Sequence, residues 1–117
     1  MRSWVTQLRK GLLEYCILAV LESDETYGYQ LIQRLRGMED LTITESTAYP
    51  ILNRLREDGY VKVRTAPSLD GPPRRYYSLT RLGKCRVREM HSYWDALTES
   101  IRGLRGIGRS KEGHEDG

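Results

Sequence analysis

Apolar residues recur every three or four positions in four segments of the chain, which predicts four helices. The segments are residues 4–21, 26–36, 44–58 and 80–104. The first segment carries a single charged residue, Glu14, between Leu12 and Leu21, so its helix needs cover on nearly every side. In a chain of 117 residues, we expect a second subunit to supply part of that cover.

Hydroxyl and glycine residues mark the ends of the second and third helices. Thr26 and Thr44 are predicted N-caps, because a short hydroxyl side chain accepts a hydrogen bond from the unpaired N–H groups of a first turn. Gly59 is predicted to end the third helix. Pro50 falls beyond that helix's free first turn, so it costs one backbone hydrogen bond and bends the helix slightly.

Alternating apolar and polar residues predict a two-stranded hairpin between the third and fourth helices. The strands are "YVKVRT" at 60–65 and "RRYYSL" at 74–79, where the side chains change face at every residue. The intervening "APSLDGPP" has the composition of a turn. We therefore expect a long tip stiffened by prolines.

The order helix, helix, helix, hairpin, helix is typical of a winged helix-turn-helix. The predicted fold is mainly α with a small β-hairpin, followed by a C-terminal dimerisation helix. The expected domains are a winged helix-turn-helix over residues 4–79, a dimerisation helix over 80–105 and a flexible tail over 106–117.

The last helix carries apolar residues in alternating steps of three and four, which is a heptad seam. The seam residues are Val87, Met90, Trp94, Leu97, Ile101 and Leu104. A domain this small has nothing to cover the whole stripe, so the pattern predicts a homodimer.

The charge of the chain is concentrated in one region. The net charge is only +3 with a pI of about 9.0, yet eight basic residues and one aspartate lie between Tyr60 and Arg88. Eight minus one gives a local excess of +7. A localised basic patch is expected of a protein that binds nucleic acid.

Catalysis and metal binding have no supporting pattern, so we expect neither an enzyme nor a cofactor. The two histidines, His91 and His114, lie in no nucleophile, acid–base or metal-ligand motif. Cys16 and Cys85 are far apart and form no CxxC pair, and no apolar run reaches transmembrane length. These features predict a cytoplasmic protein without a membrane partner.

Four motifs follow one another along the chain: "LLEYCILAVL", "YGYQLIQRL", "TESTAYPILNRLREDGYV" and "GPPRRYYSLT". In this order they resemble the PadR family of bacterial transcriptional regulators over about residues 8–83. The resemblance implies a DNA-binding repressor of the short-C-terminal subgroup, in which the last helix forms the dimer interface. Two positions depart from the family pattern, since Pro72 stands where arginine is frequent and Ala48 where leucine is common.

Ten residues are expected to contact DNA. They are Thr44, Ser46, Thr47, Tyr49, Asn53, Arg54, Lys62, Arg64, Arg74 and Arg75. Asn53 suits adenine, which it reads through two hydrogen bonds worth roughly 1–3 kcal/mol of discrimination. Arg54 suits a phosphate, and the resemblance implies that the phenol of Tyr49 reaches the DNA backbone. The alternatives are an ordinary solvated helix face and a charged strand edge that prevents aggregation.

A dimer would present two recognition helices to half-sites roughly 34–36 Å apart, which predicts a palindromic operator on double-stranded DNA. Trp94 would lie near its own mate across the two-fold axis, and the resemblance implies that paired indoles sandwich a planar aromatic effector, with Trp4 lining the same space. The alternative is that Trp94 is a packing anchor. The alternative function is a winged-helix protein-interaction module without operator binding.

Overall fold

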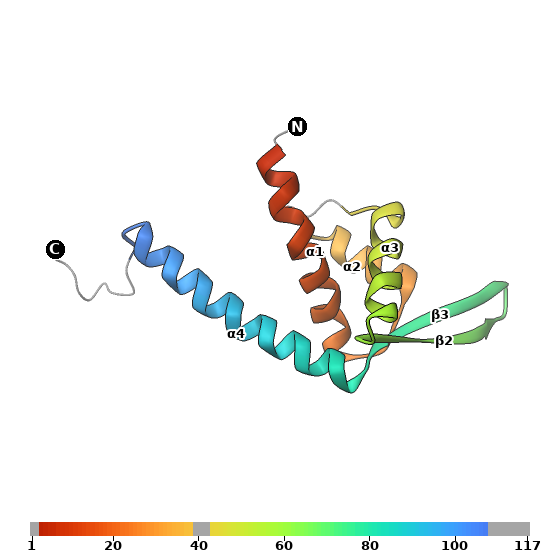
Figure 1. Cartoon of the computed structure of the whole chain (residues 1–117). Coiled ribbons are helices and arrows are strands. Elements are labelled where there is room, and N and C mark those ends of the chain that lie inside the picture. The colour runs from red at the N-terminus through yellow and green to blue at the C-terminus, as the bar shows by residue number, and fades with distance from the viewer. Residues whose placement is uncertain (1–2, 39–42, 108–117) are drawn as a thin grey trace. The chain divides into compact units, whose positions relative to one another are not determined.

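The computed structural model describes residues 3–38 and 43–107. Its elements are α1 (Ser3–Ser23), β1 (Thr26–Tyr27), α2 (Gly28–Arg36), α3 (Glu45–Glu57), β2 (Val61–Ser68), β3 (Gly71–Leu79) and α4 (Arg81–Leu104) (Figure 1). The four predicted helices and the hairpin are confirmed, and β1 is an addition. Most of the expected tail, residues 108–117, lies outside the described residues.

The chain divides into two compact units, one ending at Val87 and one beginning at Arg88. The first unit thus includes the winged helix-turn-helix and the first turns of α4, whereas the sequence placed the end of that domain at residue 79. The second unit holds the rest of α4. No helix among the described residues is long and apolar enough to cross a membrane.

The core of the first unit is made by one stripe from each helix and by the inner face of the hairpin. Its members include Leu13, Ile17, Leu18 and Leu21 of α1, Leu31, Ile32 and Leu35 of α2, Ala48, Leu52 and Leu55 of α3, and Tyr77 and Leu79 of β3. These are the apolar positions that the helical and alternating patterns predicted. The start of α1 differs, because Trp4 and Leu8 are 62% and 58% exposed.

The predicted cap of the second helix is wrong. Thr26 and Tyr27 form β1 and pair with Tyr77 and Tyr76 of β3, so the backbone of Thr26 is extended and lies in the sheet. The hydroxyl of Thr26 donates to the carbonyl of Asp24 at 3.1 Å. The helix α2 begins only at Gly28, without a side-chain cap.

The ends of α3 follow the prediction more closely. Thr44 occupies the N-cap with extended backbone angles, but its hydroxyl contacts the hydroxyls of Ser46 and Thr47 and caps no backbone N–H. Gly59 has a φ of 86°, and the N–H of Tyr60 returns to the carbonyl of Leu55 at 2.9 Å. This left-handed residue is the reason that glycine ends the helix.

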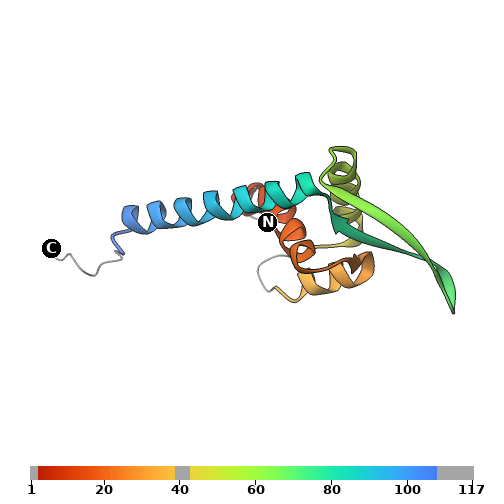
Figure 2. The same ribbon diagram turned by 90° about the horizontal axis from the view of Figure 1, so that it is seen from below.

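The sheet is antiparallel with the order β1-β3-β2. Figure 2 shows β2 and β3 twisting about each other beyond the helices of the first unit. The long tip that we predicted is wrong, because the strands pair as far as Ser68 and Gly71 and only Leu69 and Asp70 remain between them. Pro72 and Pro73 lie opposite the register shift at Pro67, where the ladder is interrupted and a missing N–H costs little.

Hydrogen bonds and a close backbone contact connect the first turn of α4 to the residues just before the hairpin. The hydroxyl of Thr80 accepts a hydrogen bond from the N–H of Gly83 at 3.0 Å and donates to the carbonyl of Gly59 at 2.6 Å. Gly83 lies so close to the backbone of Tyr60 that a Cβ there would be 2.0 Å from the Tyr60 carbonyl oxygen. Thr80 is therefore the N-cap of α4.

Candidate nucleic-acid interface

The polar face of α3 is exposed along its length, as the amphipathic pattern predicted. The exposed residues that were expected to contact DNA are Thr44, Ser46, Thr47, Asn53 and Arg54. The buried face carries Ala48, Leu52 and Leu55, which fix the helix against the core. The helix thus offers hydroxyl, amide and guanidinium groups from one side, in the chemistry that base edges and phosphates accept.

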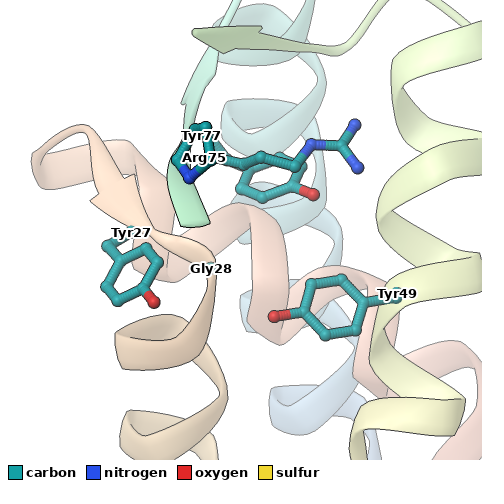
Figure 3. A pocket seen from close by; sticks show the side chains of 6 residues that line it. Tyr27, Gly28, Tyr49, Arg75 and Tyr77 are labelled. Atoms are coloured by element: carbon teal, nitrogen blue, oxygen red, sulfur yellow. The ribbon is translucent and has the colours of Figure 1, made fainter. Parts of the chain in front are cut away.

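Tyr49 differs from these residues, because its side chain turns inward. It is half-buried, and it lines a pocket of about 340 Å³ together with Gly28 of α2 and Arg75 of β3. In Figure 3 its phenol extends from α3 towards Gly28, while the side chains of Arg75 and Tyr77 extend from β3 towards α3. Burial raises the pKa of the Tyr49 phenol, with a smaller contribution from Tyr77, so its hydroxyl keeps its proton as a hydrogen-bond donor.

Arg54 has a partner within the chain. Its guanidinium lies 4.0 Å from the carboxylate of Glu14 on α1, and its side chain stays 58% exposed. An ion pair this long and this exposed contributes little to stability. Arg54 therefore lies near α1 and keeps a solvent-facing guanidinium.

The basic residues of the hairpin lie on two opposite faces of the sheet. Arg75 shares the face of Tyr77, which packs towards α3, because residues two apart in a strand point the same way. The other face carries Lys62, Arg64 and Arg74, and all three are exposed. The predicted alternation of residues 74–79 thus puts Arg74 and Arg75 on opposite faces of β3.

Among the basic residues of the hairpin, Arg64 makes the closest ion pair with a carboxylate. It donates two hydrogen bonds to the carboxylate of Glu25, at 2.8 and 3.0 Å, and its guanidinium lies 4.9 Å from the ring centre of Tyr76. This bidentate contact lowers the pKa of Glu25 and raises that of Arg64. The guanidinium of Arg74 lies in a similar way 4.8 Å from the ring centre of Tyr27.

Sequence reasoning missed the part of this face that β1 supplies. Glu25 and Tyr27 reach the sheet only because the two residues of β1 pair with β3. A two-residue strand has no detectable alternation, so the pattern of "ETYGY" contained no signal for it. The sequence predicts only the start of a helix at this motif.

The residues expected at a dimer interface are mostly exposed on α4. The exposed fractions are 38% for Trp94, 36% for Leu97, 41% for Ile101 and 86% for Leu104, and Met90 is half-buried. Val87 is an exception, because it is fully buried in this chain and belongs to the core of the first unit. Among the described residues, no group of acidic, histidine or cysteine side chains is arranged to hold a metal ion.

The chain is similar to known proteins over most of its length. Residues 17–89 match the Transcriptional regulator PadR-like family. A PadR-like transcription factor from Bacteroides fragilis shares 36% identity at a TM-score of 0.74, covering 88% of this chain and 99% of that one. A PadR-like transcriptional regulator from Bacillus cereus shares 29% identity at a TM-score of 0.76, covering 92% and 99%. An uncharacterized protein from Lysinibacillus sphaericus is 30% identical over 94 residues, which are 79% of this chain and 86% of that protein.

The family match covers more than half of the chain, and the solved relatives share its winged helix fold with the additional C-terminal helix. Proteins of this family are DNA-binding transcription regulators and not enzymes. The motifs of the first three helices and of the hairpin, the winged architecture and these comparisons agree, and the chain belongs to the PadR family of transcriptional regulators.

Proposed function

We propose that this protein is a sequence-specific repressor that binds its operator as a homodimer. The observation that supports it best is the exposed polar face of α3, with Ser46 and Asn53, within the same compact unit as the basic hairpin. In a winged helix-turn-helix, the second helix of the pair enters the major groove and the wing follows the backbone. Asn53 then reads a base, and Arg75 contacts phosphate.

The apolar residues of α4 support the dimer. Trp94, Leu97, Ile101 and Leu104 are all at least 36% exposed and follow the heptad spacing of helices that pair. Two subunits related by a two-fold axis carry two copies of α3, and these match half-sites roughly 34–36 Å apart. The operator of such a dimer is palindromic.

The same dimer supports a response to a small effector. Trp94, with Trp4 as a second candidate, offers a flat indole surface, and a planar aromatic compound bound between Trp94 and its mate would change the angle between subunits. Such a change alters the spacing of the two α3 helices and releases DNA. Quenching of tryptophan emission by a panel of planar aromatic compounds tests this part, and unchanged emission throughout contradicts it.

The experiment that tests DNA binding is a mobility-shift assay with a duplex taken from upstream of the protein's own gene. We expect retardation at low salt and a steep loss of affinity as salt rises, because phosphate contacts release counterions. If neither this duplex nor a selected pool of random duplexes is retarded, the protein is an interaction module instead. The lack of operator binding would then be attributed to Pro72, which stands in the wing where the family frequently has arginine.

Two alanine variants separate base reading from backbone contact. Asn53→Ala should reduce the preference for one base position, by roughly 1–3 kcal/mol, with little change on non-specific duplex. Arg75→Ala should weaken binding to every sequence alike. The dependence of log affinity on log salt concentration should become shallower by an amount that corresponds to about one phosphate contact. Binding-site selection on both variants gives the measurement, and an identical effect of the two variants would argue against these roles.

A further inference from the structure

The tip of the wing carries a large apolar side chain that the fold itself does not use. Leu69 is 106% exposed, and only Leu69 and Asp70 lie between the last paired residues of β2 and β3. Short hairpin turns favour glycine, asparagine and aspartate, because these residues stabilise the turn locally. Leucine brings no such stabilisation, and the exposure of Leu69 excludes a packing role, so neither turn chemistry nor the core explains it.

The residues around Leu69 make the whole tip poor in charge. The segment 66–73, "APSLDGPP", contains three prolines and no cation, and Pro67, Pro72 and Pro73 are all exposed. Asp70 is the one charged residue of this segment, and Pro72 stands where the family frequently has arginine. Phosphates are bound by cations and hydrogen-bond donors, so a tip of this composition is not suited to them. Apolar surface instead suits the sugars and base faces of a groove.

The tip is also rigid. The strands stay paired as far as Ser68 and Gly71, and the hydroxyl of Ser68 donates to the carboxylate of Asp70 at 3.3 Å. The three prolines fix the φ angle at their own positions. A rigid group loses little conformational freedom when it binds, so Leu69 is held ready at the end of a stiff arm.

The arm is long enough to pass the DNA backbone. The tip is the end of the hairpin that points away from the helices of the first unit (Figure 1, Figure 2). Thr65 pairs with Arg75, and Leu69 follows Thr65 by four residues. At the usual rise of a strand, the tip extends up to roughly 13 Å beyond Arg75. The minor groove of B-DNA is about 7.5 Å deep, so a hairpin with Arg75 on a phosphate can place Leu69 at the base pairs.

We propose that Leu69 enters the minor groove as an apolar wedge that partly unstacks one base step and bends the duplex. Architectural proteins insert leucine and other apolar side chains in this way. Steps of a pyrimidine followed by a purine, such as TA and CA, deform most readily, so the wedge selects sequence at a position that α3 does not contact. The inference rests on the proposed function and adds to it a source of operator specificity that depends on DNA shape. The carboxylate of Asp70 repels phosphates, so the apolar contact has to outweigh it.

The test is Leu69→Ala, measured on an operator obtained by binding-site selection with the wild type. Because Leu69 is exposed, resistance to urea should stay the same. We expect affinity for the operator to fall by about tenfold, because an apolar contact is lost. The dependence of log affinity on log salt concentration should not change, since no counterion is released at this contact. This separates Leu69→Ala from Arg75→Ala, which should change it.

Two further measurements report insertion directly. Energy transfer between dyes at the two ends of the operator should show that the wild type bends the duplex and that Leu69→Ala bends it less. A fluorescent adenine analogue, aminopurine, placed at the flexible step should brighten on binding of the wild type only, because unstacking relieves its quenching. Replacing the flexible step by a stiff A-tract should weaken the wild type and have little effect on Leu69→Ala.

Two variants serve as controls. Leu69→Met keeps an apolar side chain of similar volume and should retain affinity and bending. Asp70→Asn removes a negative charge at the neighbouring position, so it should raise affinity for every duplex at low salt and leave the bend unchanged. Wild-type affinity of Asp70→Asn at low salt would place the tip away from DNA and would overturn the wedge.

The outcomes separate this inference from the proposed function. Leu69→Ala protein that binds and bends the operator as the wild type does overturns the wedge and leaves the repressor proposal standing. An equal loss of affinity on every duplex, without a change in bending, also overturns the wedge, because it indicates contact with the groove wall and no insertion. Wild-type protein that binds no duplex overturns the wedge and the proposed function together.

Discussion

At the scale of single residues, Thr80 connects the end of one element to the beginning of another. Its hydroxyl accepts from the N–H of Gly83 in the first turn of α4 and donates to the carbonyl of Gly59, just after α3. One side chain thereby satisfies a donor at a helix start and an acceptor at a left-handed turn. This double role makes Thr80 more important to the fold than its place between a strand and a helix indicates.

Thr80→Ala should lower the free energy of unfolding by about 1 kcal/mol, the usual cost of removing a hydroxyl N-cap. Urea denaturation at a fixed protein concentration measures this change. Thr80→Ser keeps the hydroxyl and should retain most of the stability. Equal losses for alanine and serine would show that the methyl group, and not the cap, accounts for the effect.

At the scale of elements, β1 holds a carboxylate against the outer face of the hairpin. The pairing of Thr26 and Tyr27 with β3 brings Glu25 within 2.8 Å of Arg64. Arg64 thus meets a carboxylate of its own chain before it can meet a phosphate. In the wing, Arg64 is thus already matched by a carboxylate, and the charge of Lys62 makes a smaller electrostatic contribution to the lowered pKa of the same Glu25.

Glu25→Gln should make stability less dependent on pH. Because Arg64 lowers the pKa of Glu25 in the folded state, the ion pair stabilises the fold above the pKa of the unfolded chain and is lost as pH falls through the lower folded value. The urea midpoint of the wild type should therefore exceed that of the variant near neutral pH, and the difference should disappear as pH falls through the lowered pKa of Glu25. A difference that persists in acid would indicate packing as its source.

The same variant also tests the wing as a DNA contact. Removing the carboxylate leaves Arg64 available to a phosphate, so duplex affinity should rise at low salt. The dependence of log affinity on log salt concentration should become steeper by an amount that corresponds to about one phosphate contact. Glu57→Gln is a matched control for the loss of one negative charge, because Glu57 is exposed at the end of α3 and has no part in this pair.

The elements also show how far sequence can predict this fold. Helical periodicity identified all four helices, since each has a stripe that repeats every three or four residues. The stripe is buried in the first three helices, as with Leu52 and Leu55, and mostly exposed in α4. The pairing of Thr26 with Tyr77 was not predictable, because it depends on a contact between residues 51 positions apart. The continuation of the two strands to Ser68 and Gly71 was not predictable for a similar reason. Pro72 lies opposite the register shift at Pro67, and the sequence does not show that shift.

The candidate site likewise has one part that the sequence predicts and one part that only the fold reveals. The exposed hydroxyls and amide of α3, such as Ser46 and Asn53, followed from periodicity alone. The pocket did not, because Gly28, Tyr49 and Tyr77 come from three elements and meet only in the folded unit. The sequence indicated which residues carry the chemistry of DNA binding, and only the fold showed that the side chain of Tyr49 turns inward.

At the scale of the whole molecule, the apolar stripe of α4 predicts assembly. Exposed tryptophan, leucine and isoleucine side chains at heptad positions are unfavourable in water, and in the proposed dimer a second copy of the helix would cover them. Because Val87 is buried in this chain, the stripe available to a partner begins at Met90 and includes Trp94. The part of α4 beyond Arg88 is thus proposed as the principal dimer contact.

Leu97→Glu should convert the dimer into monomers, since it places a charge in the seam, and it should weaken operator binding much more than non-specific binding. Sedimentation velocity over a range of concentrations gives the oligomeric state. Ala96→Glu adds the same charge one residue away, at an exposed position outside the seam, and should remain dimeric. A wild type that sediments as a monomer at all concentrations would contradict the dimer.

The contact of Gly83 with the carbonyl of Tyr60 has a mechanical consequence. Because there is no room for even a methyl group between them, the first turn of α4 and the first residues of the wing must move together. Both residues lie in the first unit, so any residue larger than glycine at position 83 would push the first turn of α4 away from the residues that lead into the hairpin.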